Sequence, residues 1–322
     1  MENFKGYKKS FLGTKFNVSL PKPDKSNLRD IAPVINKKDN LLLYPNYTVL
    51  QSASRRFPIF SASNIDGKSF QSIGRKALFP GGKDKWAKDP RLSKEHQWGD
   101  ELYAAPKSDF DKGHLTKRED VQWGKTVPEA TLAAKKTFFF TNAVPQRKEL
   151  NQQIWRSLED YILKTETVKN GLKINVITGP VLNNSDPLFV NTIKGQDVKI
   201  PILFWKIVYF VKSNGELNRV GFLMGQKSLL EKSGLLRKVR QVGAGAARAK
   251  ADPLFTKFSA AGTYQVEIST IEALTKMKFH PAKDPFKDKR AIKLVLQETD
   301  LKRSGASRPG TAAPVSIKGI VL

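Results

Sequence analysis

Residues 136–166, KTFFFTNAVPQRKELNQQIWRSLEDYILKTE, decide the fold, because an apolar run of strand length leads there directly into a long amphipathic helix. The run ends at Pro145, which cannot donate to a strand ladder. An apolar stripe at helical spacing follows, with one residue in every four: Leu150, Ile154, Leu158 and Ile162. The segment predicts a strand over residues 136–146 and a helix over residues 148–166.

Further strand-like segments lie on both sides of this pair. They cover residues 41–51, 57–65, 173–182 and 201–226. Within the last of them, Asn214-Gly215 is a hairpin turn signal. Because strands are interleaved with few helices, the sequence predicts one α+β domain with a central, mostly antiparallel sheet flanked by helices.

Composition divides the chain into three parts. Residues 1–40 are polar and punctuated by proline, and we expect an irregular arm packed on the domain. Residues 41–285 form the expected domain, and residues 286–322 form a basic tail that we expect to be ordered in part at best. Within the domain, residues 79–113 are rich in Gly, Pro, Lys and Asp and predict a long surface loop, which is uncommon unless functional.

The charge balance points to a polyanionic partner. The chain has 56 lysines and arginines against 30 aspartates and glutamates, a net charge of +26. Nucleic acid is the commonest partner of such a chain, although an acidic membrane surface or a heparin-like polymer would satisfy the same excess. No apolar run reaches the length of a membrane span, so we expect no membrane partner.

The absence of cysteine excludes disulfides, thiolate catalysis, zinc ribbons and iron–sulfur clusters. The three histidines, His96, His114 and His280, are widely spaced, which does not suggest a site built on all of them. We therefore expect any metal to be a hard cation held by oxygen ligands.

Four short motifs occur in a fixed order around His114. They are Asp111-Lys112-Gly113-His114, Asn142-Ala143-Val144-Pro145-Gln146, Leu150-Asn151-Gln152 and Leu158-Glu159. In this order the chain resembles the DNA/RNA non-specific endonucleases, sugar-non-specific nucleases with a ββα-metal core that include endonuclease G. Weaker similarities at residues 64–67, 89–92 and 263–275 extend the resemblance over most of residues 40–285.

The spacing of Asn151 and Glu159 suits a sparsely ligated metal ion. Eight residues along a helix place them about 80° apart in azimuth and about 12 Å apart along the axis. That is too far for both to bind one ion directly, but it suits one direct ligand and one carboxylate acting through water, as Mg²⁺ commonly requires. The resemblance implies this division: Asn151 as the ligand of Mg²⁺, or of Mn²⁺ or another divalent cation in its place, and Glu159 holding the water shell.

Hydrolysis of a phosphodiester needs an activated water, an acid for the leaving oxygen and positive charge at the phosphate. His114 has the chemistry of a general base for the attacking water. The resemblance implies that Lys112, Asn142 and Glu159 complete the catalytic set, with Asn142 supporting the histidine, and that the products carry 5′-phosphates. Lys112 stands where the family usually has arginine, so it supplies charge without the planar fork that grips a phosphate.

A second basic stretch, residues 231–257, surrounds a centre rich in Gly and Ala. Its basic residues include Arg237, Lys238 and Arg240. Two interpretations stay open: a mobile flap that contacts nucleic-acid phosphates, or a solvated insertion.

The sequence therefore predicts a Mg²⁺-dependent endonuclease that cuts DNA and RNA with little sequence preference. The alternatives are a catalytically weak or inactive nucleic-acid-binding protein on the same scaffold, a DNA-only nuclease, and a phosphodiesterase acting on another substrate. A non-specific nuclease threatens its own cell, so we expect secretion or a periplasmic location if a signal peptide was removed, and otherwise a cytoplasmic protein with an inhibitor. A homodimer is a further expectation from the resemblance.

Overall fold

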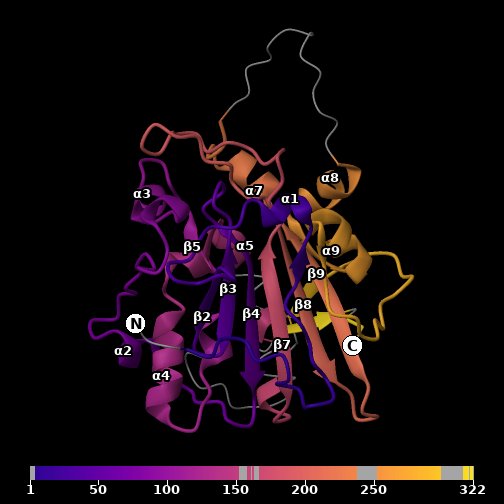
Figure 1. Cartoon of the computed structure of the whole chain (residues 1–322). Coiled ribbons are helices and arrows are strands. Elements are labelled where there is room, and N and C mark those ends of the chain that lie inside the picture. The colour runs from indigo at the N-terminus through magenta and orange to yellow at the C-terminus, as the bar shows by residue number, and fades with distance from the viewer. Residues whose placement is uncertain are drawn as a thin grey trace.

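An antiparallel sheet of eight strands forms the centre of the molecule (Figure 1). The computed structural model describes residues 4–151, 158–160, 162, 167–237, 252–298, 315–318 and 320–321. In spatial order the strands are β12 (Ile292–Lys293), β10 (Gly262–Val266), β9 (Leu217–Gly225), β8 (Leu203–Val211), β7 (Lys173–Pro180), β4 (Pro58–Asp66), β3 (Tyr47–Gln51) and β2 (Leu41–Tyr44). Each neighbouring pair is antiparallel, so the α+β prediction with a central antiparallel sheet is confirmed.

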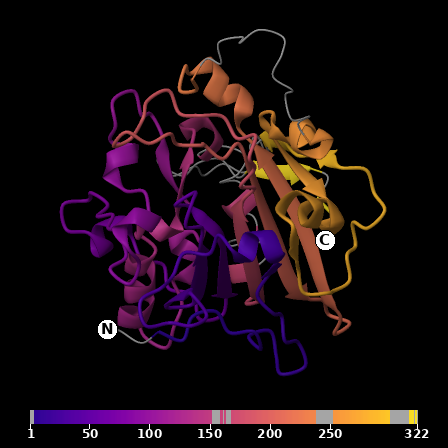
Figure 2. The ribbon, with the colours of Figure 1, turned by 45° about the horizontal axis from the view of Figure 1, so that its top comes forward.

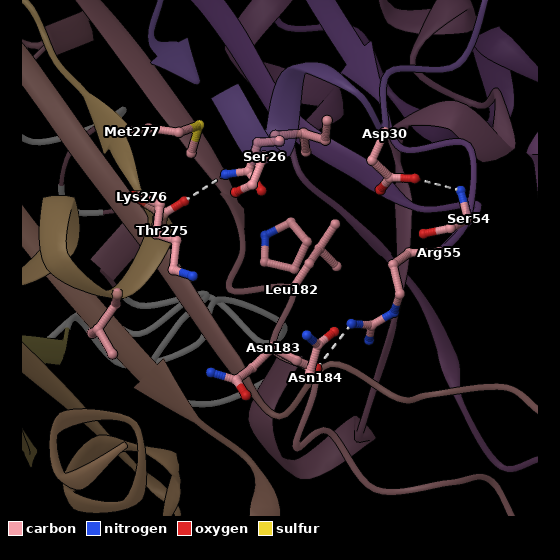
Figure 3. A pocket seen from close by; sticks show the side chains of 14 residues that line it. Ser26, Asp30, Ser54, Arg55, Leu182, Asn183, Asn184, Thr275, Lys276 and Met277 are labelled. Atoms are coloured by element: carbon pink, nitrogen blue, oxygen red, sulfur yellow. Dashed lines mark hydrogen bonds between the residues drawn. The ribbon is translucent and has the colours of Figure 1, made fainter. Parts of the chain in front are cut away.

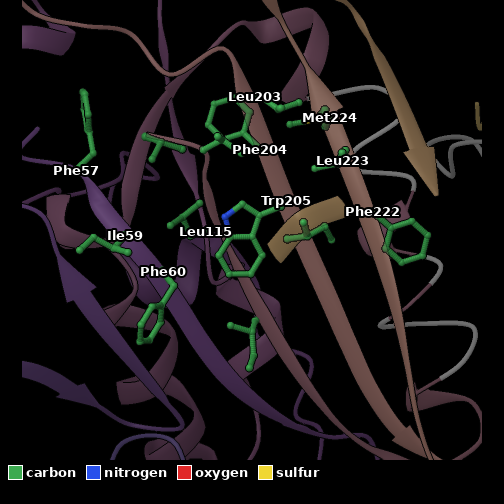
Figure 4. Packing of buried hydrophobic residues seen from close by; sticks show 14 of the residues in the cluster. Phe57, Ile59, Phe60, Leu115, Leu203, Phe204, Trp205, Phe222, Leu223 and Met224 are labelled. Carbon is green, nitrogen blue, oxygen red and sulfur yellow. The ribbon is translucent and has the colours of Figure 1, made fainter. Parts of the chain in front are cut away.

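The four middle strands carry the core, because apolar and β-branched residues run along most of their length. Figure 4 shows Trp205 of β8 in the middle of this core, with Phe60 of β4 to one side and Phe222 of β9 to the other. The predicted turn at Asn214-Gly215 joins β8 to β9, and Gly215 adopts the positive φ of 79° that favours glycine there.

Short helices lie beside both edges of the sheet. The first part of the chain, in indigo and purple, lies toward the β2 edge, and the last part, in orange and yellow, lies toward the β12 edge (Figure 2). The helices are α1 (Lys25–Leu28), α2 (Arg75–Leu78), α3 (Asp100–Tyr103), α4 (Val127–Lys136), α5 (Lys148–Asn151), α7 (Lys227–Lys232), α8 (Pro253–Ser259) and α9 (Ile268–Thr275). Three 3₁₀ turns are η1 (Lys94–His96), η2 (Arg118–Val121) and η3 (Phe140–Asn142). Helices α8 and α9 pack on β9, whereas α4 packs on α2 and η2.

A small ladder outside the main sheet positions the predicted site. Strand β5 (Asp111–His114) pairs with β6 (Ala143–Gln146), and His114 lies opposite Ala143. Helix α5 begins two residues after β6 and contacts β5, so strand, strand and helix form one unit (Figure 1). This is the ββα arrangement that the family resemblance implied.

Two local predictions were wrong. Residues 41–51 form a hairpin and not one strand, because the chain reverses at Pro45 and Asn46, the latter with φ 68°. Only residues 143–146 of the predicted strand over 136–146 form a strand. Helix α4 continues to Lys136, where Ala130, Ala133 and Ala134 bury its inner face, and η3 follows at residues 140–142. Of the predicted helix over residues 148–166, the described parts at 148–151 and 158–160 are helical.

The two ends of the chain contact the domain. In the N-terminal arm, Tyr7 donates its hydroxyl to the Val18 carbonyl and accepts a hydrogen bond from Asn175 of β7. Strand β1 (Lys22–Pro23) of the arm pairs with β11 (Met277–Lys278). In the tail, β12 joins the main sheet and β13 (Val295–Glu298) pairs with β14 (Val315–Lys318), while residues 299–314 lie outside the described part. None of the described helices has the length and apolar character needed to cross a bilayer.

Candidate active site

A cavity of about 420 Å³ opens beside β5. It is lined by Asp111, Lys112 and His114 of β5 together with Arg75, Asp84, Trp86, Tyr103 and Phe110. The structure thus brings the predicted base and the predicted phosphate-binding lysine to one surface. Its lining combines charged side chains of both signs with three aromatic rings.

His114 is packed between aromatic rings. Its imidazole lies 4.6 Å from the ring of Trp86 and 4.8 Å, edge to face, from the ring of Phe138, measured between ring centroids. Burial, and then the positive charges of Arg75, Arg118 and Lys117, lower the pKa of His114 to about 3. The Nε2 atom is buried and has no hydrogen-bond partner among the described residues. The low pKa keeps the imidazole neutral at pH 7, the protonation state that a general base needs, and makes it a weak base in the free protein.

Lys112 lies two residues before His114 on the same strand and lines the same cavity. Its ammonium is 2.9 Å from the carboxylate of Asp100 in α3 and 5.7 Å from the ring centre of Phe140. Asp100 is exposed, so the pair contributes little to stability.

Arg75 is the main residue that sequence reasoning missed. It lies on α2, far from His114 in sequence, and forms an ion pair of 3.1 Å with Asp84 while its side chain stays more than half exposed. No motif marks it. The only signal was indirect, because Asp84, Trp86 and Tyr103 of the same cavity fall inside the loop of residues 79–113 that was expected to be functional.

Asn142 lies behind the cavity and not in its lining. Its amide donates to the carbonyls of Thr116 and Thr137 at 2.9 and 3.1 Å and accepts from the Thr116 backbone N–H at 2.9 Å. Because the Asn142 carbonyl also accepts from Leu115 at 3.0 Å, this residue fixes the chain directly after His114. Its place is that of a positioning residue.

The two predicted metal-site residues lie on the helical segment after β6. Asn151 is the last residue of α5, the helix that contacts β5, and its side chain lies outside the described part of the structure. Glu159 is buried and accepts a hydrogen bond of 2.7 Å from Lys206 of β8. It lines a small interior cavity with Asp120, Ile162 and Lys206 and not the cavity that His114 lines.

The donors that these two residues offer, an amide oxygen and a carboxylate, are the oxygen ligands that a hard divalent cation prefers. Within the described residues, no group of three or more His, Cys, Asp or Glu side chains could hold a metal ion. The donor types suit a hydrated cation, but Glu159 is paired with Lys206 in an interior cavity that His114 does not line.

Arg237, from the second basic stretch, is 2.7 Å from the carboxylate of Asp197. Lys238 and Arg240 lie outside the described residues. The flap interpretation of this stretch stays a prediction.

A second cavity, of about 450 Å³, lies between α1, the end of β7 and the end of α9 (Figure 3). Two of its charged residues already have internal partners: Arg55 binds Asp186 at 2.6 Å, and Asp30 accepts from the Ser54 backbone N–H at 2.8 Å. It holds none of the predicted site residues. The cavity beside β5 is therefore the candidate active site.

The fold and this cavity define a nuclease-like α+β protein with a ββα unit. Residues 26–286 match the family model of the DNA/RNA non-specific endonucleases, and the chain belongs to that family.

Similar proteins include an uncharacterized protein, y4fB, of Sinorhizobium fredii, 32% identical over 232 residues that cover 69% of this chain and 32% of that protein. A nuclease of Nostoc sp. is 34% identical over 108 residues, 34% of each chain. The matched region therefore spans about a third of the length of these relatives. The crystal structure of the EndoG/EndoGI complex shares the fold, with a TM-score of 0.51, 16% identity, and coverage of 74% of this chain and 84% of that one.

Proposed function

We propose that this chain is a metal-dependent endonuclease that hydrolyses phosphodiester bonds of DNA and RNA with little sequence preference. The observation that carries the proposal is a neutral His114 in one cavity with Lys112 and Arg75. A base beside two cations suits attack of water on a phosphodiester, where the negative charge grows as the bond forms.

In this mechanism His114 takes the proton of the attacking water at Nε2, the buried atom that has no protein partner among the described residues. Lys112 and Arg75 attract and orient the phosphate, the lysine as a point charge and the arginine through its planar guanidinium. Trp86 and Phe138 hold the imidazole ring in place. Asn142 fixes the chain that follows His114.

Asn151 would bind a hydrated Mg²⁺ ion, or Mn²⁺ in its place, and Glu159 would hold the ion's water shell. When bound, the ion supplies positive charge for the phosphate oxygens and acidic water for the departing 3′ oxygen. The products of this cleavage carry 5′-phosphates.

The net charge of +26 supports a nucleic-acid substrate, because phosphate contacts give affinity without recognising bases. The same charge would suit a nucleic-acid-binding protein without activity, or a DNA-only nuclease. An inhibitor protein is a fitting partner, since the structure with the same fold was determined in a complex described as EndoG inhibition.

The test is digestion of supercoiled plasmid and total RNA with and without Mg²⁺, beside His114→Ala. We expect metal-dependent loss of both polymers, and a rate about 10²–10⁴-fold lower in the variant. Cleavage of the plasmid but not of the RNA would restrict the proposed substrate to DNA. If the plasmid stays intact but shifts on a gel at low salt, the protein binds nucleic acid without cleaving it, and the proposed nuclease activity is wrong.

A further inference from the structure

A buried hydroxyl in the lining of the candidate active site has no hydrogen-bond partner among the described residues. Tyr103, the last residue of α3, lines the cavity beside β5 and is 8% exposed. Its Oη atom is buried, and within the described part of the chain it neither donates nor accepts a hydrogen bond. A buried hydroxyl that is left unpaired makes a fold less stable, so stability does not explain this group.

The other buried tyrosines of the described residues all use their hydroxyls within the fold. The three donate as follows: Tyr44 to Asp89 at 2.6 Å, Tyr47 to the Lys136 carbonyl at 2.7 Å and Tyr209 to the His280 carbonyl at 3.0 Å. None of these three lines the cavity beside β5. The unpaired hydroxyl is therefore the one that lies at the candidate active site.

Tyr103 and the phosphate-binding lysine of the cavity have neighbours in common. The ring of Tyr103 stacks on that of Phe140, with centroids 5.7 Å apart and planes inclined by 17°. The ammonium of Lys112 lies 5.7 Å from the centre of the same Phe140 ring. Asp100, at the start of the helix that Tyr103 ends, forms an ion pair of 2.9 Å with Lys112. The phenol and the ammonium therefore belong to one part of the cavity lining.

The chemistry of the Tyr103 hydroxyl calls for an acceptor. Burial raises the pKa of Tyr103 well above its usual range, so the phenol keeps its proton at neutral pH and can donate it to a hydrogen bond. The cations of Lys112 and Arg75 in the same lining attract an anion. A phosphodiester offers two charged non-bridging oxygens, and hydrogen bonds to charged acceptors are the stronger ones.

We propose that Tyr103 is a substrate-binding residue: its hydroxyl donates a hydrogen bond to a non-bridging oxygen of the phosphodiester that Lys112 and Arg75 attract. This inference rests on the proposed function. The Nε2 atom of His114, in the same cavity, is likewise buried and unpaired among the described residues. Substrate that reaches this base has to open the cavity, and the hydroxyl becomes accessible with it.

The test removes only the hydroxyl. Tyr103→Phe is assayed on a thymidine tetranucleotide, which is short enough to make few contacts outside the cavity, and is unfolded in urea. We expect kcat/KM to fall about tenfold, as for one hydrogen bond to a charged acceptor. The free energy of unfolding should stay the same or rise, because the hydroxyl has no partner among the described residues that the change would leave unpaired.

The matched control is Tyr47→Phe, the same change at a fully buried tyrosine outside the cavity lining. Its hydroxyl donates to the Lys136 carbonyl, so its removal should lower the free energy of unfolding. The folded control should keep the wild-type kcat/KM. The two variants are therefore expected to show opposite patterns.

A sulfur atom in place of one non-bridging oxygen shows whether the hydroxyl contacts the phosphate. Sulfur is a weak acceptor, so only one of the two phosphorothioate diastereomers should lose the bond to Tyr103. The ratio of kcat/KM between the diastereomers should therefore change from the wild type to Tyr103→Phe. An unchanged ratio would mean that the hydroxyl contacts another group, such as the attacking water, and would overturn the proposal.

Other results would also overturn it, and they differ in what they imply. If Tyr103→Phe cleaves the tetranucleotide as the wild type does, or is less stable than the wild type, the hydroxyl serves the fold and the nuclease stands. If the wild type cleaves neither the tetranucleotide nor plasmid DNA, with or without Mg²⁺, the proposed function fails as well.

Discussion

The imidazole of His114 and the indole of Trp86 lie with their ring centroids 4.6 Å apart, at an interplanar angle of 51°. Trp86 comes from the chain after α2 and His114 from β5, so this contact closes one wall of the cavity. It also removes water from the ring that has to accept a proton. The contact therefore affects both the shape of the site and the pKa of its base.

Trp86→Leu should raise the pKa of His114 from about 3 toward the ordinary value of 6.5, because burial is the main cause of the lowering. Titration of the imidazole signals by NMR measures this directly in the free protein. The wild-type ring should stay neutral at pH 5. A wild-type ring that titrates near pH 6.5 would contradict the prediction.

The lowered pKa of His114 also determines how the free energy of unfolding changes with pH. Between pH 6.5 and about 3, the unfolded chain binds a proton on this histidine that the folded chain does not, so the free energy of unfolding falls as the pH falls through that window. His114→Gln, which cannot titrate, should lose less stability than the wild type between pH 7 and pH 4.5 in urea unfolding. Parallel losses would show that another group is responsible.

Arg75→Ala should weaken substrate binding, because the cavity loses a guanidinium from its lining. We expect KM for DNA to rise about tenfold, as for one charge-assisted hydrogen bond of about 1.5 kcal/mol. The slope of log affinity against log salt should fall by about 1. Arg29→Ala changes the same charge at an exposed residue outside the cavity and should leave KM close to that of the wild type.

Lys112→Arg restores the residue that the family usually has and adds the planar fork that lysine lacks. We expect kcat/KM to rise several-fold, about 1 kcal/mol of transition-state stabilisation, whereas Lys112→Met should lower it. Both variants lose or alter the exposed pair with Asp100 at 2.9 Å, so unfolding in urea should barely change. Equal values of kcat/KM in the wild type and both variants would show that Lys112 takes no part in substrate binding or catalysis.

Asn142→Ala should destabilise the fold as well as lower activity. The change leaves the backbone groups of Thr116 and Thr137 buried without their amide partner, a loss on the order of 3 kcal/mol. Urea unfolding measures it. If stability stays unchanged while activity disappears, Asn142 takes part in the chemistry and does not only position the chain.

The pKa of Asp120 predicts a change of the free energy of unfolding with pH that runs in the opposite direction. Burial raises the pKa of Asp120 to about 7, although Lys206 and Lys117 act against it. Between pH 3.8 and about 7 the folded chain therefore binds a proton that the unfolded chain has lost, and the free energy of unfolding falls as the pH rises. Asp120→Asn should stabilise the protein at pH 8 more than at pH 5, as measured by urea unfolding at both values.

Local patterns in the sequence predicted the features that depend on neighbouring residues. The turn at Asn214-Gly215 followed from a short-range signal. The ββα unit followed from the family resemblance alone, and its first strand, β5, begins inside residues 79–113, which were predicted to be a loop. The antiparallel sheet followed from the density of strands. Residues 41–51, which look like a single strand, form a hairpin because Pro45 and Asn46 favour a turn more strongly than the flanking residues favour a continuous strand.

Long-range contacts could not be predicted in this way. Arg75 and Trp86 meet His114 only because the loop after α2 folds back over β5. The partner of Glu159 is a lysine on a strand that otherwise looks like apolar core, and nothing in its sequence neighbours reveals the ion pair. Such pairs depend on which segments the sheet places side by side.

Strand β8, with Lys206 at its middle, follows every motif of the site in the chain. A polypeptide leaving the ribosome would therefore present His114, Asn151 and Glu159 before the residue that holds the Glu159 carboxylate exists. The strand also joins β7 to β9 in the middle of the main sheet. A nascent chain that ends before β8 lacks the strand that joins the two parts of the sheet, so we expect it not to cleave the messenger RNA beside it.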